Sequence, residues 1–258
     1  MSLKRLLLAT CTLSALLLVS GVQAATTVSS IIGDNMVLQR NAPVVLWGWD
    51  DAGTKVSVSI GGSSATATAG KDGSWSVSLP AMKAGGPHEI AINGSSKLNI
   101  KNVLVGEVWF CSGQSNMEWT VSRSLNPKEE IAAGNHPTIR HIKFPHTTAD
   151  KPQAQAKTQG WTVTTPQTVA NYTAVGYYFA RNLQKELKVP VGLIGCNWGG
   201  TRIEPWTPPA GFKAVPALKD ISDNLASFPK KDKNGRIQHQ TALAIYNSMV
   251  HPVLQYRF

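Results

Sequence analysis

The sequence predicts an antiparallel β-sandwich followed by an α/β domain built on a parallel sheet. Residues 27–104 hold short segments in which apolar and polar residues alternate, separated by glycine-containing turns. After residue 105 the pattern changes to continuous apolar runs and a long helical period. A chain of 258 residues accommodates one large domain or two smaller ones. We therefore expect one domain over residues 25–104 and another over residues 105–258.

Regular alternation and tight turns define the expected sandwich. Residues 56–60 read Val-Ser-Val-Ser-Ile and residues 75–79 read Trp-Ser-Val-Ser-Leu, so one face of each strand is apolar and the other is wet. Similar strands are expected near residues 44–47, 65–68, 89–92 and 98–100. Trp47 and Trp75 fit core packing better than sugar stacking. The acidic pair at residues 50–51 fits a solvated turn better than a calcium site.

The expected α/β domain contains apolar runs long enough for buried strands. Residues 105–110 and 191–196 are such runs, residues 139–144 are strand-like, and residues 128–133 and 243–250 are helical candidates. Residues 173–187 predict a helix that Thr173 caps. Its apolar side chains recur every four residues on one face, at Val175, Phe179, Leu183 and Leu187. A helix followed by a buried strand is half of a βαβ unit, which indicates a parallel sheet.

Two of the apolar runs end in turns of small residues. The first leads into Ser115 through Ser-Gly-Gln, and the second leads into Gly199 and Gly200 through Asn-Trp. Ligands of open α/β sheets bind beyond the carboxyl ends of the strands. If these strands are neighbours, Ser115 and the glycines face one crevice, where a serine hydroxyl and backbone N–H groups serve acyl transfer. The alternative is an ordinary polar loop after a strand.

The first 24 residues have the pattern of a secretory signal peptide. Lys4 and Arg5 precede an apolar run over residues 6–19, and small residues lead up to a cleavage site after Ala24. The run is too short for a membrane-spanning helix, and no later segment is apolar enough for stable membrane insertion. A cytosolic amphipathic N-terminus is the alternative. We expect a secreted or periplasmic protein whose formal charge falls from +10 to +8 when Lys4 and Arg5 are removed.

Composition argues against several other functions. Lysine and arginine are spread along the chain, whereas nucleic-acid binding requires basic residues clustered on one face. The densest group, over residues 230–236, lies in a loop-like segment that we expect to be solvated. Cys111 and Cys196 remain after the signal peptide, and as buried strand residues they are expected to stay unpaired. No His/Cys cluster has zinc-ligand spacing, so no metal or cofactor is expected.

Several motifs in order resemble the sialate O-acetylesterase-like branch of the SGNH (GDSL-type) hydrolases. Residues 106–119 (Gly-Glu-Val-Trp-Phe-Cys-Ser-Gly-Gln-Ser-Asn-Met-Glu-Trp) resemble its nucleophile block, and residues 192–206 resemble its second block. Residues 31–40 are similar to the start of the β-rich region in bacterial members, and residues 246–252 to a later helix. Met117 occupies the position of the last glycine in the Gly-x-Ser-x-Gly elbow of the α/β-hydrolases. The motif therefore argues against an α/β-hydrolase fold and fits the SGNH resemblance.

The resemblance implies an SGNH-type three-layer domain and an esterase that removes O-acetyl groups from sugars such as sialic acid. It implies that Ser115 is the nucleophile and that Gly199 or Gly200 donates a backbone N–H to the oxyanion hole. The family also has an asparagine block and a late Asp-His pair, yet no Asp in this chain has a His two or three residues after it. His239 and His251 do not match the family's base.

The chain is therefore expected to be the N-terminal part of a longer enzyme, with an incomplete sheet. An unactivated serine is a poor nucleophile, so we expect the chain alone to hydrolyse acetyl esters poorly. An unpaired sheet edge and exposed apolar surface are expected to promote association. The competing hypotheses are an exported glycan-binding module that uses Trp49 or Trp75, and an exported structural protein without a small-molecule site. The sequence leaves the oligomeric state open.

Overall fold

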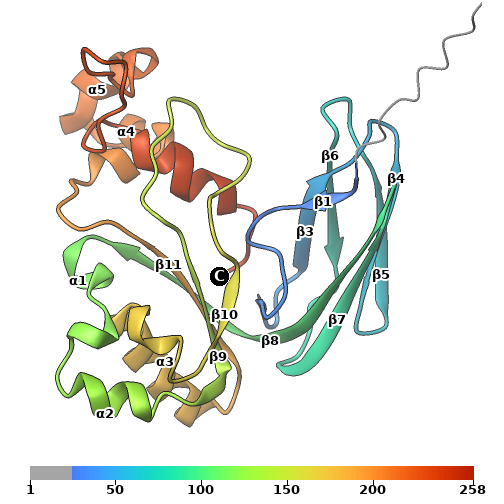
Figure 1. Cartoon of the computed structure of the whole chain (residues 1–258). Helices are drawn as coiled ribbons and strands as arrows, with labels where there is room; N and C mark the ends of the chain where they lie inside the picture. The colour runs from blue at the N-terminus through green and yellow to red at the C-terminus, as the bar shows by residue number, and fades with distance from the viewer. Residues whose placement is uncertain (1–24) are drawn as a thin grey trace, which may run out of the picture.

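The computed structural model describes residues 25–258 (Figure 1). The predicted signal peptide lies outside the described residues. A three-stranded sheet has the order β1-β3-β6, and an eight-stranded sheet has the path β10-β9-β11-β8-β7-β4-β5, with β2 alongside β8. Figure 1 shows the strand-rich N-terminal half on the right and the helix-containing half on the left, with β8 running between them.

The strands and helices have the following bounds. The small sheet consists of β1 (Thr27–Val28), β3 (Val44–Trp49) and β6 (Ser74–Leu79). The large sheet consists of β2 (Val37–Gln39), β4 (Lys55–Ile60), β5 (Ser63–Thr68), β7 (Gly85–Asn93), β8 (Lys97–Gly113), β9 (His136–Lys143), β10 (Trp161–Thr164) and β11 (Val191–Asn197). The helices are α1 (Ser115–Glu118), α2 (Pro127–Ala132), α3 (Ala174–Leu187), α4 (Pro209–Ala214), α5 (Lys219–Asp223) and the π-helical η6 (Tyr246–Val250).

The antiparallel pairing expected of the N-terminal region is present. β3 pairs with β6, and β4 pairs with β5 on one side and β7 on the other, all antiparallel. Alternation puts Val56, Val58 and Ile60 of β4 in the core and turns the serines outward. Trp47 and Trp75 are both buried, which confirms their prediction as core residues.

The acidic turn at residues 50–51 differs from the expectation, because Asp50 is only 5% exposed. Its carboxylate accepts hydrogen bonds from the Thr26 hydroxyl at 2.7 Å and from the Ser95 backbone N–H at 3.1 Å. Burial raises the pKa of this carboxyl, but these hydrogen bonds and one from Asp51 outweigh it and lower the pKa to about 2. The prediction of a solvated turn was therefore wrong for Asp50. Its carboxylate connects the segment leading into β1 to the turn between β7 and β8.

One continuous strand, β8, connects the two halves. Its first part pairs antiparallel with β7, and its second part pairs parallel with β11. The strand crosses the predicted domain boundary between residues 104 and 105 without a break. At Gly106 a Cβ atom would lie 2.0 Å from the carbonyl oxygen of Pro190, so only glycine allows the chain leading into β11 to approach this closely.

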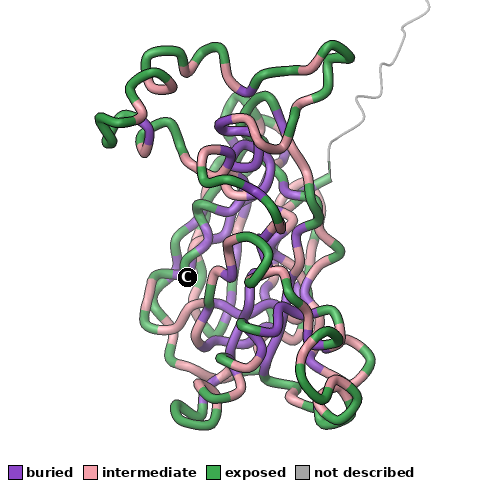
Figure 2. Tube along the Cα trace, turned by 90° about the vertical axis from the view of Figure 1, so that its left-hand side faces the viewer, coloured by how far each residue is buried: buried purple, intermediate pink, exposed green. Residues whose placement is uncertain are grey.

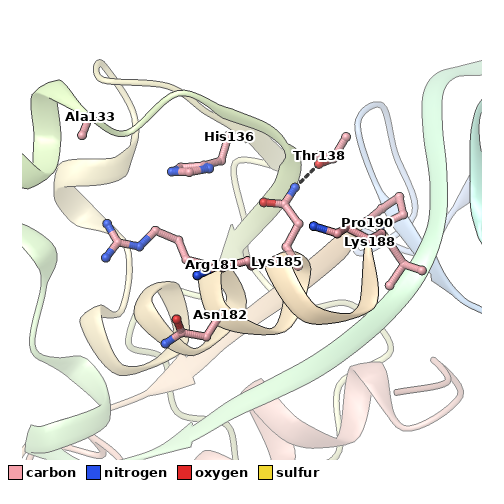
Figure 3. A pocket seen from close by; sticks show the side chains of 10 residues that line it. Ala133, His136, Thr138, Arg181, Asn182, Lys185, Lys188 and Pro190 are labelled. Carbon is pink, nitrogen blue, oxygen red and sulfur yellow. Dashed lines mark hydrogen bonds between the residues drawn. The ribbon is translucent and has the colours of Figure 1, made fainter.

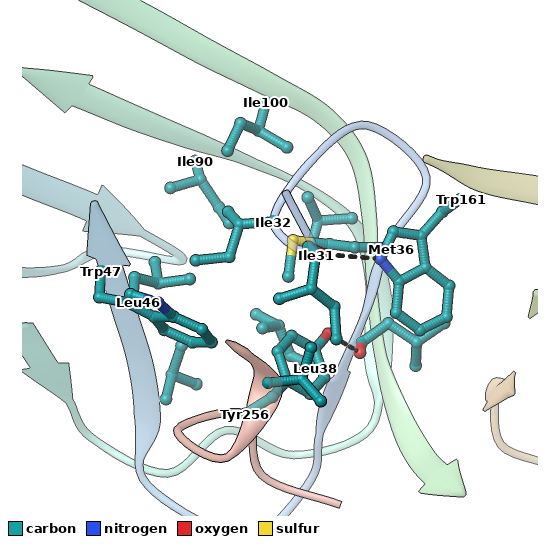
Figure 4. Packing of buried hydrophobic residues seen from close by; sticks show 14 of the residues in the cluster. Ile31, Ile32, Met36, Leu38, Leu46, Trp47, Ile90, Ile100, Trp161 and Tyr256 are labelled. Carbon is teal, nitrogen blue, oxygen red and sulfur yellow. Dashed lines mark hydrogen bonds between the residues drawn. The ribbon is translucent and has the colours of Figure 1, made fainter. Parts of the chain in front are cut away.

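The hydrophobic core is shared between the two halves. Buried residues of the sandwich, such as Ile31 and Met36, belong to the same cluster as Trp161 and Tyr256 from the later half (Figure 4). The Trp161 indole N–H donates to the Ile31 carbonyl at 2.7 Å, and the Tyr256 hydroxyl donates to the carbonyl of Val37. Figure 2 shows buried positions gathered along the middle of the trace, with exposed positions in the loops at either end.

The later half has three layers around the parallel strands β8, β11 and β9. Helix α3 packs on one face, where Gly176 lies against the Cys111 sulfur. Segment η6 covers the other face, where the Cys196 thiol lies 3.6 Å from the carbonyl oxygen of Met249. Cys111 and Cys196 therefore point to opposite faces, and both are free and buried, as predicted. Among residues 25–258 no helix is both long and apolar enough to cross a membrane.

Helix α3 begins after Thr173, whose side chain accepts a hydrogen bond from the Gly176 N–H, as the capping prediction required. The apolar stripe of this helix is not the face that it buries most deeply. Val175 is 50% exposed and Phe179 is 40% exposed, whereas the buried positions include Gly176 and Ala180. Small residues face the sheet because they allow the helix to approach the strands closely. Phe179 packs edge-on against the equally exposed Trp109 of β8.

Candidate active site

The three parallel strands bring their carboxyl ends to one edge of the sheet. Gly113 at the end of β8 is in register with Asn197 at the end of β11, and Gly195 is in register with Lys143 at the end of β9. The turn that carries Ser115 and the turn that carries the two glycines are therefore neighbours, as expected from the sequence. A Cβ atom on Gly199 would lie 3.4 Å from the Ser115 hydroxyl oxygen.

One oxygen atom, Oε1 of Gln114, accepts hydrogen bonds from three donors at this edge. The backbone N–H of Ser115 lies 3.2 Å from it, the Ser115 hydroxyl 3.0 Å, and the backbone N–H of Gly200 3.1 Å. The two backbone donors predicted for an oxyanion hole can thus converge on a single oxygen. Gly200 has a φ of +76°, a conformation that glycine adopts without strain and that directs the turn.

The Gly199 N–H has a different partner. It donates to Oε2 of Glu118 at 2.6 Å, and the other carboxylate oxygen of Glu118 lies 2.6 Å from Nε2 of His146. The side chains of Glu118 and His146 are each about one-third exposed, 32% and 36%. Of the two glycines, Gly200 is the one whose N–H shares an acceptor with the Ser115 N–H. The Gly199 N–H instead anchors the Glu118–His146 pair to the turn.

Aromatic rings surround the same turn. The His146 ring stacks on the Trp198 ring, with ring centres 4.3 Å apart and an angle of 2° between the ring planes. His239 also stacks on Trp198, at 4.9 Å and 13°. The Gln240 side chain donates to the Gly200 carbonyl at 2.7 Å, which fixes the other end of the turn. The stacked rings and this hydrogen bond hold the glycine turn in place beside Ser115.

Beneath the turn lies a lysine that the sequence patterns did not single out. The Lys143 ammonium donates to the side-chain oxygen of Asn197, whose amide nitrogen donates to the Cys111 carbonyl at 3.1 Å. Burial lowers the pKa of Lys143, while the negative charge of Glu118 raises it. Burial raises the pKa of the Cys111 thiol to about 12, so this sulfur remains protonated near neutral pH.

Two cavities flank the parallel strands. One of about 730 Å³ lies where β9 and β11 begin, at the end opposite Ser115, and its lining includes Arg181, Lys185 and Lys188 (Figure 3). The Arg181 guanidinium is paired with Glu130 at 2.6 Å. The other cavity, of about 430 Å³, includes Lys143 in its lining and therefore adjoins the candidate site. Within residues 25–258 no group of three or more His, Cys, Asp or Glu side chains is arranged to hold a metal ion.

The structure brings Ser115, Gly199 and Gly200 together and adds Glu118, His146 and the stacked tryptophan to them. His251 lies elsewhere, with Nδ1 3.1 Å from the Gln153 carbonyl oxygen. One signal could have identified His146: it follows the strand-like segment at residues 139–144, and the end of a parallel strand is where ligands bind. Glu118 stands three residues after Ser115, one helical turn away, which is a second usable signal.

With this geometry established, comparisons with known proteins define the class of the protein. Residues 105–227 match the family model described as carbohydrate esterase, sialic acid-specific acetylesterase. A solved structure of a carbohydrate acetylesterase from Xanthomonas citri superposes with a TM-score of 0.78 at 33% identity, covering 90% of this chain and 49% of that one. The class that fold and sequence define is that of the carbohydrate esterases.

Curated relatives identify the branch within that class. The sialate O-acetylesterases of Pongo abelii and Homo sapiens are each 30% identical over 245 residues, and that of Rattus norvegicus is 33% identical over 214 residues. The chain belongs to the sialate O-acetylesterase-like family, in agreement with the motif resemblance. The alignments cover 87% of this chain but 45% of the first two relatives, so the chain spans about half of their length.

Proposed function

We propose that this chain carries the nucleophile and oxyanion hole of an exported SGNH-type carbohydrate O-acetylesterase. Ser115 attacks the carbonyl carbon of an acetyl ester on a sugar such as sialic acid. The backbone N–H groups of Ser115 and Gly200 then stabilise the oxygen that becomes negative. The observation that carries the proposal is the position of Gln114 Oε1, which both N–H groups reach at 3.2 and 3.1 Å.

In this mechanism the Gln114 oxygen marks the place that the ester oxygen takes. The Gln114 side chain is exposed and rotates away when the ester binds, and the ester oxygen then accepts from the same two donors. A single oxyanion-hole donor contributes roughly 3 kcal/mol to lowering the barrier. The Glu118–His146 pair holds the Gly199 N–H and so keeps the turn in the conformation that presents Gly200.

Within residues 25–258, the Ser115 hydroxyl has no general base as its hydrogen-bond partner. This hydroxyl donates to the amide oxygen of Gln114, which is not a base. The Glu118 carboxylate is engaged elsewhere, because one oxygen accepts from the Gly199 N–H and the other lies 2.6 Å from Nε2 of His146. We therefore expect slow hydrolysis by the chain alone. An aryl acetate has a leaving group that departs without protonation, so slow Ser115-dependent hydrolysis of such an activated ester remains measurable without a general base.

The test is the hydrolysis of 4-methylumbelliferyl acetate and of 9-O-acetylated N-acetylneuraminic acid. Ser115→Ala is expected to reduce the rate to that of the buffer. Ser112→Ala, which removes a hydroxyl three residues earlier at the end of β8, is expected to leave it unchanged. A rate that survives Ser115→Ala excludes this serine as the nucleophile. Fast turnover that depends on Ser115 supports the esterase but contradicts the absence of an activating base.

The proposal includes export, with cleavage near Ala24, on the strength of the signal-peptide pattern in residues 1–24. Expression of the complete gene in a bacterium, followed by periplasmic release and N-terminal sequencing, tests it. A mature chain that begins at residue 25 is the expected result. A protein that keeps residues 1–24 and stays with the cytosolic fraction contradicts it.

A further inference from the structure

The cavity beside the candidate site has a lining suited to an acidic sugar. It has a volume of about 430 Å³ and lies between the end of β9, strand β10 and the segment that leads into α3. Lys143 belongs both to this lining and to the network under the glycine turn, because its ammonium donates to Asn197. A ligand bound in the cavity therefore lies next to the Ser115 site.

Lys143 is the single charged side chain in this lining. The other titratable groups there are His141 and Tyr172, whose rings stack with centres 4.3 Å apart. Burial, assisted by the charge of Lys143, lowers the pKa of His141 to about 3, so this histidine is neutral at physiological pH. The lining contains no carboxylate, so Lys143 has no negatively charged partner within the cavity.

The ammonium of Lys143 also has donors to spare. An ammonium group carries three N–H donors, and the hydrogen bond to the neutral Asn197 oxygen uses one. Glu118 acts on Lys143 through its charge, but one of its oxygens accepts from the Gly199 N–H and the other lies 2.6 Å from Nε2 of His146. A partly buried cation of this kind is stabilised by an anion that arrives with the ligand.

Three amide side chains complete the lining on the solvent side. Gln159, Gln167 and Asn171 are exposed, and their side chains make no hydrogen bond to any other described residue. Each amide offers both donors and an acceptor, as recognition of sugar hydroxyls requires. The cavity thus combines one cation at its inner end with hydroxyl-binding amides at its mouth.

We propose that this cavity is the subsite for the carboxylate-bearing part of an acidic sugar, with Lys143 as the residue that selects acidic over neutral substrates. The inference rests on the proposed function, because it places the acetyl ester on Ser115 while the carboxylate lies on Lys143. It predicts that affinity depends on the negative charge of the sugar and not only on its hydroxyl groups.

The experiment measures binding of N-acetylneuraminic acid and of its neutral methyl ester by isothermal titration calorimetry, using the Ser115→Ala variant. Neither ligand carries an O-acetyl group, so the readout does not depend on hydrolysis. The acid is expected to bind roughly tenfold more tightly than the ester, as expected for one charge-assisted hydrogen bond. Lys143→Met should remove that difference, and Lys143→Arg should retain most of it.

Two further variants make the outcome decisive. Lys185→Met changes a lysine in the cavity at the other end of the sheet and should leave both affinities unchanged. Gln167→Ala alters an exposed side chain of the cavity and should weaken binding of the acid and of the ester equally. This variant still tests binding in the cavity if Lys143→Met fails to fold. Equal binding of acid and ester, or loss of the acid preference in Lys185→Met, overturns the assignment. Acid-selective binding without esterase activity refutes the proposed function but not the subsite.

Discussion

Replacing Gly199 by alanine tests how the glycine turn supports Ser115. The new Cβ atom would lie 2.8 Å from Oε2 of Glu118 and 3.4 Å from the Ser115 hydroxyl oxygen. An ordinary contact needs about 3.5 Å, so the carboxylate must move by about 0.7 Å. The hydrogen bond from the Gly199 N–H, now 2.6 Å, then lengthens past the ~3.2 Å limit of a good bond.

Two effects of Gly199→Ala follow from this displacement, and they differ in size. The lost hydrogen bond is accepted by the Glu118 carboxylate, whose side chain is 32% exposed, so its effect on the free energy of unfolding is about 1 kcal/mol. Misplacement of the turn beside Ser115 has the larger consequence, because an error of about 1 Å at a reacting centre costs roughly 10²-fold in rate. We therefore expect a large loss of rate with a small loss of stability.

The assay compares hydrolysis of 4-methylumbelliferyl acetate with the urea unfolding midpoint for each variant. Gly211→Ala is the matched control. Its Cβ atom would lie 2.7 Å from a methyl group of Thr207 in the α4 region, away from Ser115. This control should leave the rate unchanged. If Gly199→Ala retains the wild-type rate, or if Gly211→Ala lowers the rate as much, the role assigned to the turn is incorrect.

Three other predictions concern the stability of the fold and the association of the chain. Gly106→Ala places a Cβ atom 2.0 Å from the Pro190 carbonyl oxygen and should lower the free energy of unfolding by about 3 kcal/mol in urea titrations, whereas Gly33→Ala, where the space is open, should not. The pKa of Asp50 is lowered to about 2, so its ionised carboxylate should contribute about 2 kcal/mol to the free energy of unfolding above about pH 4. This contribution should disappear as the pH falls through about 2. The unfolding midpoints of Asp50→Asn should lack this pH dependence. Phe179→Glu should shift sedimentation of the chain toward monomer, because this ring is 40% exposed; an unchanged profile contradicts association through that face.

The sequence predicted the candidate site residues from a general rule that connects strand ends to ligands. Two apolar runs that end in small residues predicted that the turns of Ser115 and of the glycines at 199 and 200 are neighbours if their strands are adjacent, and the parallel pairing of β8 with β11 confirms that adjacency. The choice between the glycines required side-chain geometry. The structure shows that the N–H groups of Gly200 and Ser115 share one acceptor, whereas the Gly199 N–H donates to Glu118.

Other features were beyond sequence patterns because they depend on contacts between distant residues. Asp50 is buried by Thr26 and the β7–β8 turn, which lie 24 residues before it and 45 residues after it. The apolar period of α3 pointed to Phe179, but close packing on the sheet favours the small side chain of Ala180. The Glu118–His146 pair joins an α1 residue to the loop after β9. In each case local pattern determined the element, and tertiary packing determined which side chains it buried or paired.

The central claim, that Ser115 is the nucleophile of this site, is tested most directly by covalent labelling. The chain is incubated with a fluorophosphonate probe, digested and analysed by tandem mass spectrometry, with Ser115→Ala and Ser112→Ala treated in parallel. We expect slow formation of one adduct on Ser115, absent from Ser115→Ala and retained in Ser112→Ala. An adduct on another serine, or no adduct after prolonged incubation, would contradict it.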